Sequence, residues 1–289
     1  MRTFAVIGAS LLAALQCVPL AANEVQAGEQ YEILVSYETK AEGDGSSSSS
    51  RGRTAYLERV VSQDDDCVVR EFDLIDDPNR QRPLVAWEMP ARVSVCRTGE
   101  RTLANVPEME ARLERFLKEA KVSRDYCGKY YFTWNVFKIE CDPQTVLETI
   151  EHLDLVSIPL AENSRYEVPG GADPIHLLLV SKSDKGWIWE GEVPVDPEYL
   201  REEAARNQVV VGEISGEPVS FEQALNSVAR HSYSGQIKVR FEAGPAMQEI
   251  TRTIETTLRE VNANGDAEDR FATETTQRKR VGGSSSRPF

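Results

Sequence analysis

The chain has 289 residues, and its 33 lysines and arginines stand against 47 aspartates and glutamates, a formal net charge of −14 at pH 7. An acidic chain lacks the basic footprint that nucleic acids and anionic membrane surfaces require, so we expect neither as a partner. The charges are interspersed along the sequence, as on a solubilising surface. A chain of this length can bury one substantial core or two smaller ones.

The N-terminal residues have the layout of a secretory signal peptide. Arg2 supplies a basic region, residues 4–15 form a short apolar run, and small residues follow. We expect residues 1–22 to be removed, with cleavage after Ala27 as the alternative. The apolar run is shorter than the roughly 20 residues of a membrane span, and no later run approaches that length. The sequence therefore predicts a mature chain without a transmembrane segment.

A lipidated N-terminus is the alternative to simple cleavage, because Cys17 ends the apolar run. Gln16 precedes it, whereas a lipidated cysteine normally follows a small residue, so simple cleavage is favoured. The sequence contains no Asn-x-Ser/Thr acceptor, which agrees with a bacterial protein. We expect a periplasmic or secreted protein, with a Gram-negative cell envelope favoured.

Four cysteines remain after the signal peptide, and an even number in an exported chain predicts two structural disulfides. The sequence has no Cys-x-x-Cys pair, which argues against a zinc site and against a thioredoxin-like redox centre. We favour sequential pairs because they close short loops, although four cysteines allow three pairings. The expected bridges are Cys67 with Cys96 and Cys127 with Cys141.

Residues 28–158 are expected to form a disulfide-stapled α+β subdomain. Apolar and polar residues alternate at 31–37, which is the period-2 signature of a half-buried strand. The Gly/Ser-rich residues 43–52 then indicate a flexible hairpin tip. Residues 106–122 carry apolar side chains at helical spacing, which predicts a helix packed on a sheet, with Asn105 as its candidate N-cap.

The stretch DYCGKYYFTWNVFKIECDP, which begins at Asp125, is rich in aromatic and β-branched residues. This composition predicts a central strand covered on both faces and held at its ends by Cys127 and Cys141. Asp142, followed by a proline, predicts the start of a short helix. Burial is the favoured fate of the aromatic side chains. A ligand platform is the alternative, and its candidate residues are Tyr130 and Trp134.

A second α+β subdomain is expected at residues 175–281, after a proline- and glycine-rich junction at 158–174. It begins with a hairpin whose turn lies at 183–186, and a helix then starts at Asp196. The valine-rich residues 208–214 indicate a buried strand.

The remainder of this subdomain contains one further helix and two long strands. Ser220 and Gln223 form the pattern of a capping box at the start of the helix. Residues 247–261 fit a helix or a strand, and their many threonines favour a strand. A turn at 262–266 leads into the last strand, and residues 282–289 are expected to be a disordered tail.

The predicted fold class is α+β: a predominantly antiparallel β meander or curved sheet with three to four short helices, in two sequential subdomains. This appearance is similar to that of Gram-negative envelope proteins whose curved sheet wraps a helix and sometimes a lipid. The similarity is one of architecture, and it indicates no particular family.

No catalytic residue is assigned, because the sequence contains no Gly-x-Ser-x-Gly, Ser-x-x-Lys or His-Glu-x-x-His motif. Its three histidines are widely spaced, so we expect no metal site and no cofactor. Trp187 and Trp189 share one strand face, where core packing is favoured over a ligand surface. Glu190 and Glu192 share the other face, and solvation is the commonest fate of such acids.

Two functions are consistent with these features. The favoured one is a non-enzymatic periplasmic or cell-envelope protein that binds an apolar or envelope-derived ligand, such as a lipid or glycan, or a protein partner. The alternative is a hydrolase of cell-envelope polymers that uses Glu190 and Glu192 as paired carboxylates. The candidate ligand-binding residues are Trp187, Trp189, Tyr130 and Trp134.

Overall fold

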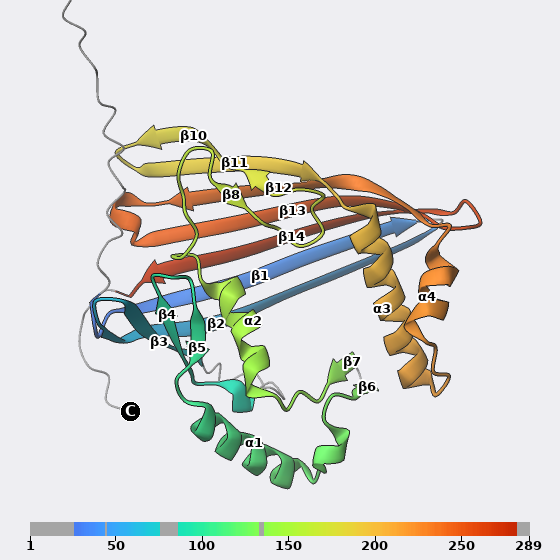
Figure 1. Ribbon diagram of the computed structural model, residues 1–289. Helices are drawn as coiled ribbons and strands as arrows, with labels where there is room; N and C mark the ends of the chain where they lie inside the picture. The colour runs from blue at the N-terminus through green and yellow to red at the C-terminus, as the bar shows by residue number, and fades with distance from the viewer. Residues whose placement is uncertain (1–25, 44, 76–85, 133–135, 282–289) are drawn as a thin grey trace, which may run out of the picture.

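A curved antiparallel sheet of ten strands is the frame of the molecule, in a computed structural model that describes residues 26–43, 45–75, 86–132 and 136–281. Figure 1 shows the sheet as a continuous layer with the helices below it. In spatial order its strands are β10 (Leu178–Ser183), β11 (Gly186–Pro194), β12 (Ser232–Ala243), β13 (Glu249–Val261), β14 (Ala267–Arg280), β1 (Gln30–Gly43), β2 (Ser46–Gln63), β3 (Cys67–Leu74), β4 (Ala91–Cys96) and β5 (Arg101–Leu103).

The first strand of the chain pairs with the last, so both halves of the chain share this sheet. Tyr31 of β1 lies opposite Arg280 of β14, and the ladder continues to Gly43 opposite Glu268. The predicted antiparallel sheet with short helices is confirmed, whereas two sequential subdomains are not shown. Separate halves would leave β1 and β14 with unpaired backbone edges, and pairing them satisfies both edges.

The hairpin of β1 and β2 is longer than the sequence indicates. The serine tract of β2 pairs with β1, with Ser50 opposite Thr39. The expected flexible tip at 43–52 is therefore wrong for most of its length, because the backbone hydrogen bonds of the ladder include these residues. Gly52 lies opposite Tyr37, whose ring fills the space that a Cβ at this position would need.

Four α-helices lie in the described part of the chain: α1 (Val106–Ala120), α2 (Val146–Leu153), α3 (Pro197–Ser215) and α4 (Phe221–Val228). Three predicted helix starts are confirmed. The Asp142 side chain caps the 3-10 turn η3 (Pro143–Thr145) that leads into α2, Asp196 caps α3, and Ser220 with Gln223 forms the capping box of α4. The carboxylate or hydroxyl oxygen at each start accepts a backbone N–H that would otherwise lack a partner.

Asn105 precedes α1 but makes no cap hydrogen bond with its side chain. Its amide instead bridges two backbone groups of the neighbouring segment. The side-chain oxygen accepts from the Arg92 N–H at 2.8 Å, and the side-chain NH2 donates to the Pro90 carbonyl at 3.0 Å. Asn105 therefore occupies the predicted N-cap position, but its side chain fixes the start of α1 against β4 instead of capping the helix.

The helix α3 is longer than predicted, because residues 208–214 continue it rather than form a buried strand. The helix ends at Gly216, whose left-handed conformation provides the C-cap. Valine favours strands, but the single glycine of this segment, Gly212, costs a helix only about 1 kcal/mol, and β12 already has β11 and β13 as its neighbours. Val211 is 63% exposed, whereas Val209 packs against a small cluster of Ala205, Ala224 and Val228, so the segment is only partly buried.

Two hydrophobic clusters line the same face of the sheet. In the first, Leu113 of α1 and Ile150 of α2 pack with Ile33 of β1 and Phe72 of β3. In the second, the segment after α2 packs on β11, β12 and β13. Its buried members are Leu155, Leu160, Ile175, Leu177, Trp189, Val193, Val195, Ile237, Val239, Phe241, Ala243 and Ile250. The segment predicted as a subdomain junction therefore contributes to the core, and it carries the two-stranded sheet of β8 (Arg165–Tyr166) and β9 (Ile175–His176).

The aromatic stretch after α1 does not form a central strand. It contains two short strands, β6 (Tyr130–Phe132) and β7 (Val136–Lys138), which pair antiparallel outside the large sheet. Tyr130 lies opposite Lys138, so the chain doubles back within the predicted strand. Pairing in a local hairpin satisfies the β preference of these residues without a place in the main sheet.

Candidate ligand-binding pocket

Both predicted disulfides are present, and the favoured pairing is confirmed. Cys67 and Cys96 lie directly opposite each other on β3 and β4, with their Cα atoms 4.0 Å apart. Cys127 and Cys141 join the two ends of the β6–β7 hairpin, with their Cα atoms 5.5 Å apart. Disulfide-bonded sulfurs are neither thiolate nucleophiles nor thiolate metal ligands, so these bridges are structural.

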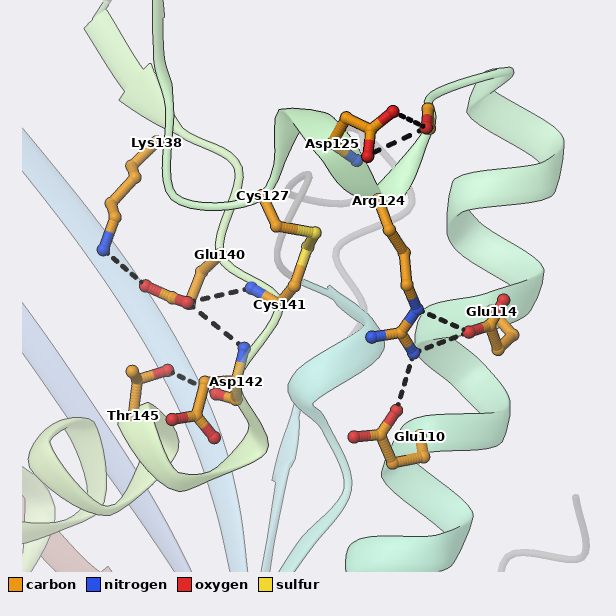
Figure 2. The surroundings of a disulfide bond; sticks show 11 residues. Glu110, Glu114, Arg124, Asp125, Cys127, Lys138, Glu140, Cys141, Asp142 and Thr145 are labelled. Atoms are coloured by element: carbon orange, nitrogen blue, oxygen red, sulfur yellow. Dashed lines mark hydrogen bonds and ion pairs between the residues drawn. A yellow bond between two sulfur atoms is a disulfide. The ribbon is translucent and has the colours of Figure 1, made fainter.

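Ion pairs tie the loop before the hairpin to α1 (Figure 2). Arg124, in the 3-10 turn η2 (Arg124–Tyr126), donates to Glu114 at 2.7 Å and to Glu110 at 2.9 Å. Both acids lie on α1, one turn apart. Cys127 follows directly, so the disulfide and the ion pairs together connect the hairpin to the helix.

The other end of the hairpin is held by Glu140 (Figure 2). Its carboxylate accepts a hydrogen bond from Lys138 Nζ at 2.9 Å and from the backbone N–H groups of Cys141 at 2.9 Å and Asp142 at 3.2 Å. Burial by itself would raise the pKa of Glu140, but these hydrogen bonds lower it below its usual value. The side chain therefore stays ionised near neutral pH.

An apolar pocket of about 330 Å3 opens beside this hairpin. Its walls come from the 3-10 turn η1 (Ala86–Glu88), the C-terminal end of α1, η2 and the two arms of the hairpin. The volume is at the low end of the range for small-molecule sites. The main apolar and aromatic lining residues are Trp87, Phe116, Val122, Tyr126, Tyr131 and Ile139, and the ionisable ones are Lys121, Lys138 and Glu140.

The pocket is apolar within and open to water on one side. Trp87 is 5% exposed and belongs to the first hydrophobic cluster, against which Phe116 packs. Tyr126 is 45% exposed, and its ring centroid lies 5.9 Å from that of Tyr131. An apolar molecule could therefore enter past the tyrosines and contact the core behind them.

Glu88 is a partly buried carboxyl group on η1, next to Trp87. Burial, together with the negative charge of Glu140, raises the pKa of Glu88 to about 7. At neutral pH the Glu88 carboxyl is therefore divided between its protonated and ionised forms.

The predicted ligand-binding residues do not gather at this pocket. Tyr130 is half-buried in β6, and its backbone N–H donates to Glu213 of α3 at 3.3 Å. Trp134 lies outside the described residues. Trp189 is 3% exposed in the second hydrophobic cluster, and Trp187 packs beside it with 6.2 Å between ring centroids. The three described residues are thus divided between the hairpin and a separate core.

Glu190 and Glu192 lie on the sheet face opposite the two tryptophans, as the sequence predicts for a strand. Each has a basic partner on β12: Glu190 pairs with Arg240, and Glu192 lies 3.9 Å from Lys238 Nζ. All four side chains line an open groove of about 800 Å3. The tryptophans border the other face of the sheet, so they do not join the two acids in one sugar-binding cleft.

The described ranges contain neither a group of side chains that could hold a metal ion nor a helix that could span a membrane. No group of three or more His, Cys, Asp or Glu side chains there is placed to hold a metal ion. His231 Nδ1 lies 2.8 Å from Glu260, whereas His152 and His176 belong to α2 and β9. No helix in these ranges is long and apolar enough to cross a membrane.

No family model matches the chain, and no curated protein matches it. No family is therefore shown. Among solved structures, the attachment invasion locus protein Ail of Yersinia pestis, in complex with the heparin analogue sucrose octasulfate, is 5% identical with a TM-score of 0.20, over 88% of this chain and 99% of that chain. An outer membrane channel from Pseudomonas putida F1 is 8% identical with a TM-score of 0.22, over 91% and 99%. A hot dog fold protein from Alicyclobacillus acidocaldarius is 9% identical with a TM-score of 0.13, over 92% and 83%. Scores this low carry no argument about fold or function, so the pocket is interpreted from its own geometry.

None of the pocket-lining residues is among the ligand-binding candidates that the sequence indicates, and two of them show why. Phe116 lies in the apolar stripe of α1, and that stripe was assigned entirely to packing. Trp87 lies in a short segment without periodicity. The signal that could have found the pocket is the aromatic excess near Tyr126 and Tyr131, which exceeds what one strand needs for packing.

Proposed function

We propose that this protein is an exported, non-enzymatic envelope protein that binds a small apolar ligand in the pocket beside the β6–β7 hairpin. The observation that carries the proposal is the pocket itself, where aromatic and aliphatic side chains from separate segments surround about 330 Å3. The predicted signal peptide and the two disulfides support an oxidising compartment, the periplasm or the cell exterior. A lipid is the favoured ligand, whereas a glycan or a protein partner would need a more polar or a larger surface.

The proposal is tested with N-phenyl-1-naphthylamine, a neutral probe that becomes fluorescent in apolar surroundings. We expect the oxidised protein to bind one equivalent of the probe saturably. Ala120 lines the pocket from an exposed position on α1, so Ala120→Phe should fill the cavity without disturbing the core. We expect this variant to bind the probe at least about tenfold more weakly, which is about 1.4 kcal/mol.

The matched control is Glu119→Phe, which adds the same side chain at the adjacent exposed position of α1, outside the pocket lining. It should bind the probe as the wild type does. If Ala120→Phe and Glu119→Phe bind equally well, or if the wild type shows no saturable site, the pocket is not the binding site.

A further inference from the structure

The mouth of the pocket carries a lysine in an unusual backbone conformation. Lys121 follows the last residue of α1, with φ 55° and ψ 37°, the left-handed region. Glycine or asparagine usually occupies this position, because a side chain there is sterically disfavoured. Lys121 also lines the pocket and is exposed to solvent. A residue with a cationic side chain thus occupies a strained position at the opening of an apolar cavity.

The charged side chains of the pocket lining include two lysines and one glutamate, so positive charge is in excess. Lys138 and Glu140 pair with each other at 2.9 Å. Lys121 is then the remaining lysine of the lining, and Glu140 is already engaged. Among the residues that the structure describes, no carboxylate lies within ion-pair distance of the Lys121 ammonium group. Lys129 Nζ lies 5.3 Å from the centroid of the Tyr126 ring and adds a second positive charge near the mouth. Lys121 and Lys129 therefore place two positive charges near the mouth, although the negative charge of Glu213 acts on Tyr131 of the lining. The chain as a whole has a net charge of −14.

We infer that the pocket binds a single-chain amphiphile with a carboxylate head group, a free fatty acid, and that Lys121 binds the head while the chain enters the cavity. The inference rests on the proposed function and adds the chemical class of the ligand. An apolar interior with a cationic rim complements an aliphatic chain that ends in an anion. The small volume favours one chain over the two of a phospholipid.

The test compares three ligands with the same twelve-carbon chain and different heads: dodecanoate, dodecanol and dodecyltrimethylammonium. Each competes with N-phenyl-1-naphthylamine at low salt and below its micellar concentration. We expect dodecanoate to bind roughly three- to fivefold more tightly than dodecanol, the fold-change of a solvent-exposed ion pair, and the ammonium compound to bind more weakly than either. Added salt should reduce the difference in affinity between ligands with different head groups, because salt screens exposed charges.

Two substitutions at residue 121 separate head-group binding from folding. Lys121→Gln keeps most of the side chain, and Lys121→Gly suits the left-handed backbone, so its fold is secure. Both should lose the preference for dodecanoate over dodecanol. Lys118→Gln, one turn earlier on α1 and outside the lining, is the matched control and should keep the preference.

The outcomes distinguish this inference from the proposed function. If dodecanol displaces the probe as well as dodecanoate does in the wild type, the pocket binds chains but the carboxylate assignment is wrong. Loss of the preference in Lys118→Gln to the same extent as in Lys121→Gln would also overturn the role of Lys121. If no ligand of the series displaces the probe, the proposed function itself fails.

Discussion

Glu88 shows how the fold changes the chemistry of a single residue. Its carboxyl group is partly buried beside Trp87, and burial together with Glu140 raises its pKa from 4.5 to about 7. The folded protein therefore retains a proton on Glu88 at pH values where the unfolded chain has released it. By linkage, the stability that this proton contributes is complete below about pH 4.5 and is lost as the pH rises through about 7.

We predict that Glu88→Gln removes this part of the pH dependence. In the wild type, the free energy of unfolding should fall by on the order of 1 kcal/mol between pH 5 and pH 7.5 because of Glu88, after allowance for solvent screening of a side chain that is only partly buried. Urea unfolding at several pH values measures the slope. Glu119→Gln, at an exposed position of α1, is the control. If the unfolding free energy of Glu88→Gln changes with pH as steeply as that of the wild type, Glu88 titrates alike in the folded and unfolded states.

At the scale of elements, the β6–β7 hairpin depends on the Cys127–Cys141 bridge, because it lies outside the large sheet. The bridge closes a loop with a sequence separation of 14, which is worth about 3 kcal/mol in the loop-entropy model. It also positions Tyr131 and Ile139, which line the pocket on the two arms of the hairpin. We therefore expect stability and probe binding to be coupled in this element.

We predict that replacing Cys127 and Cys141 together by alanine lowers the melting temperature and also weakens probe binding below that temperature. Replacing Cys67 and Cys96 should destabilise the fold by a comparable amount, about 3–4 kcal/mol, without weakening probe binding, because that bridge joins β3 to β4 away from the pocket lining. Thermal unfolding and probe titration of the two variants measure both effects. Equal losses of probe binding in the two variants would contradict the assignment of the pocket to the hairpin.

At the scale of the whole molecule, buried charges separate the two hydrophobic clusters on the inner face of the sheet. Arg278 of β14 lies opposite Ile33, which belongs to the first cluster, and opposite Ile250, which belongs to the second. Its guanidinium donates to both oxygens of Glu58, at 2.5 and 3.1 Å, and lies 3.3 Å from the Tyr31 ring centroid. Burial opposes the charge on Arg278, but the Glu58 carboxylate raises the pKa of Arg278, so the guanidinium stays charged.

A second buried carboxylate, Asp154, lies between Leu153 of the first cluster and Leu155 of the second. It accepts from Arg70 at 3.0 Å and from Arg101 at 3.3 Å. Burial by itself would raise the pKa of Asp154, but these arginines and hydrogen bonds to Ser157 lower it. The network therefore joins the segment after α2 to β3 and β5, at the boundary between the first and the second hydrophobic cluster.

We predict that Arg278→Met destabilises the protein by roughly 3–5 kcal/mol, because it leaves the buried Glu58 without its main partner. The control is Arg280→Met, two residues further along β14, where the pair with Glu29 at 2.6 Å is partly exposed to solvent. That substitution should cost less than about 1 kcal/mol. Equilibrium unfolding in guanidinium chloride compares the two. Similar costs for both would show that burial does not distinguish the two ion pairs.

Features that local chemistry specifies could be predicted from the amino-acid sequence. Helix starts at Asp142, Asp196 and Ser220 were predicted because a capping side chain acts on its own next few residues. The strand at 249–261 was predicted from its threonines, and the disulfide pairs from the short loops they close.

Features that depend on partners distant in the chain could not be predicted in this way. That β1 pairs with β14, and so joins both halves in one sheet, depends on residues far apart in the chain. Residues 208–214 continue a helix because the neighbouring sheet positions are already filled, and the aromatic stretch folds into a hairpin because its strands pair with each other. The pocket belongs to the same class: Trp87, Phe116 and Tyr131 lie in three separate segments of the sequence, and folding places them around one cavity. Local patterns specify local hydrogen bonds, whereas a cavity is defined by residues that only folding brings together.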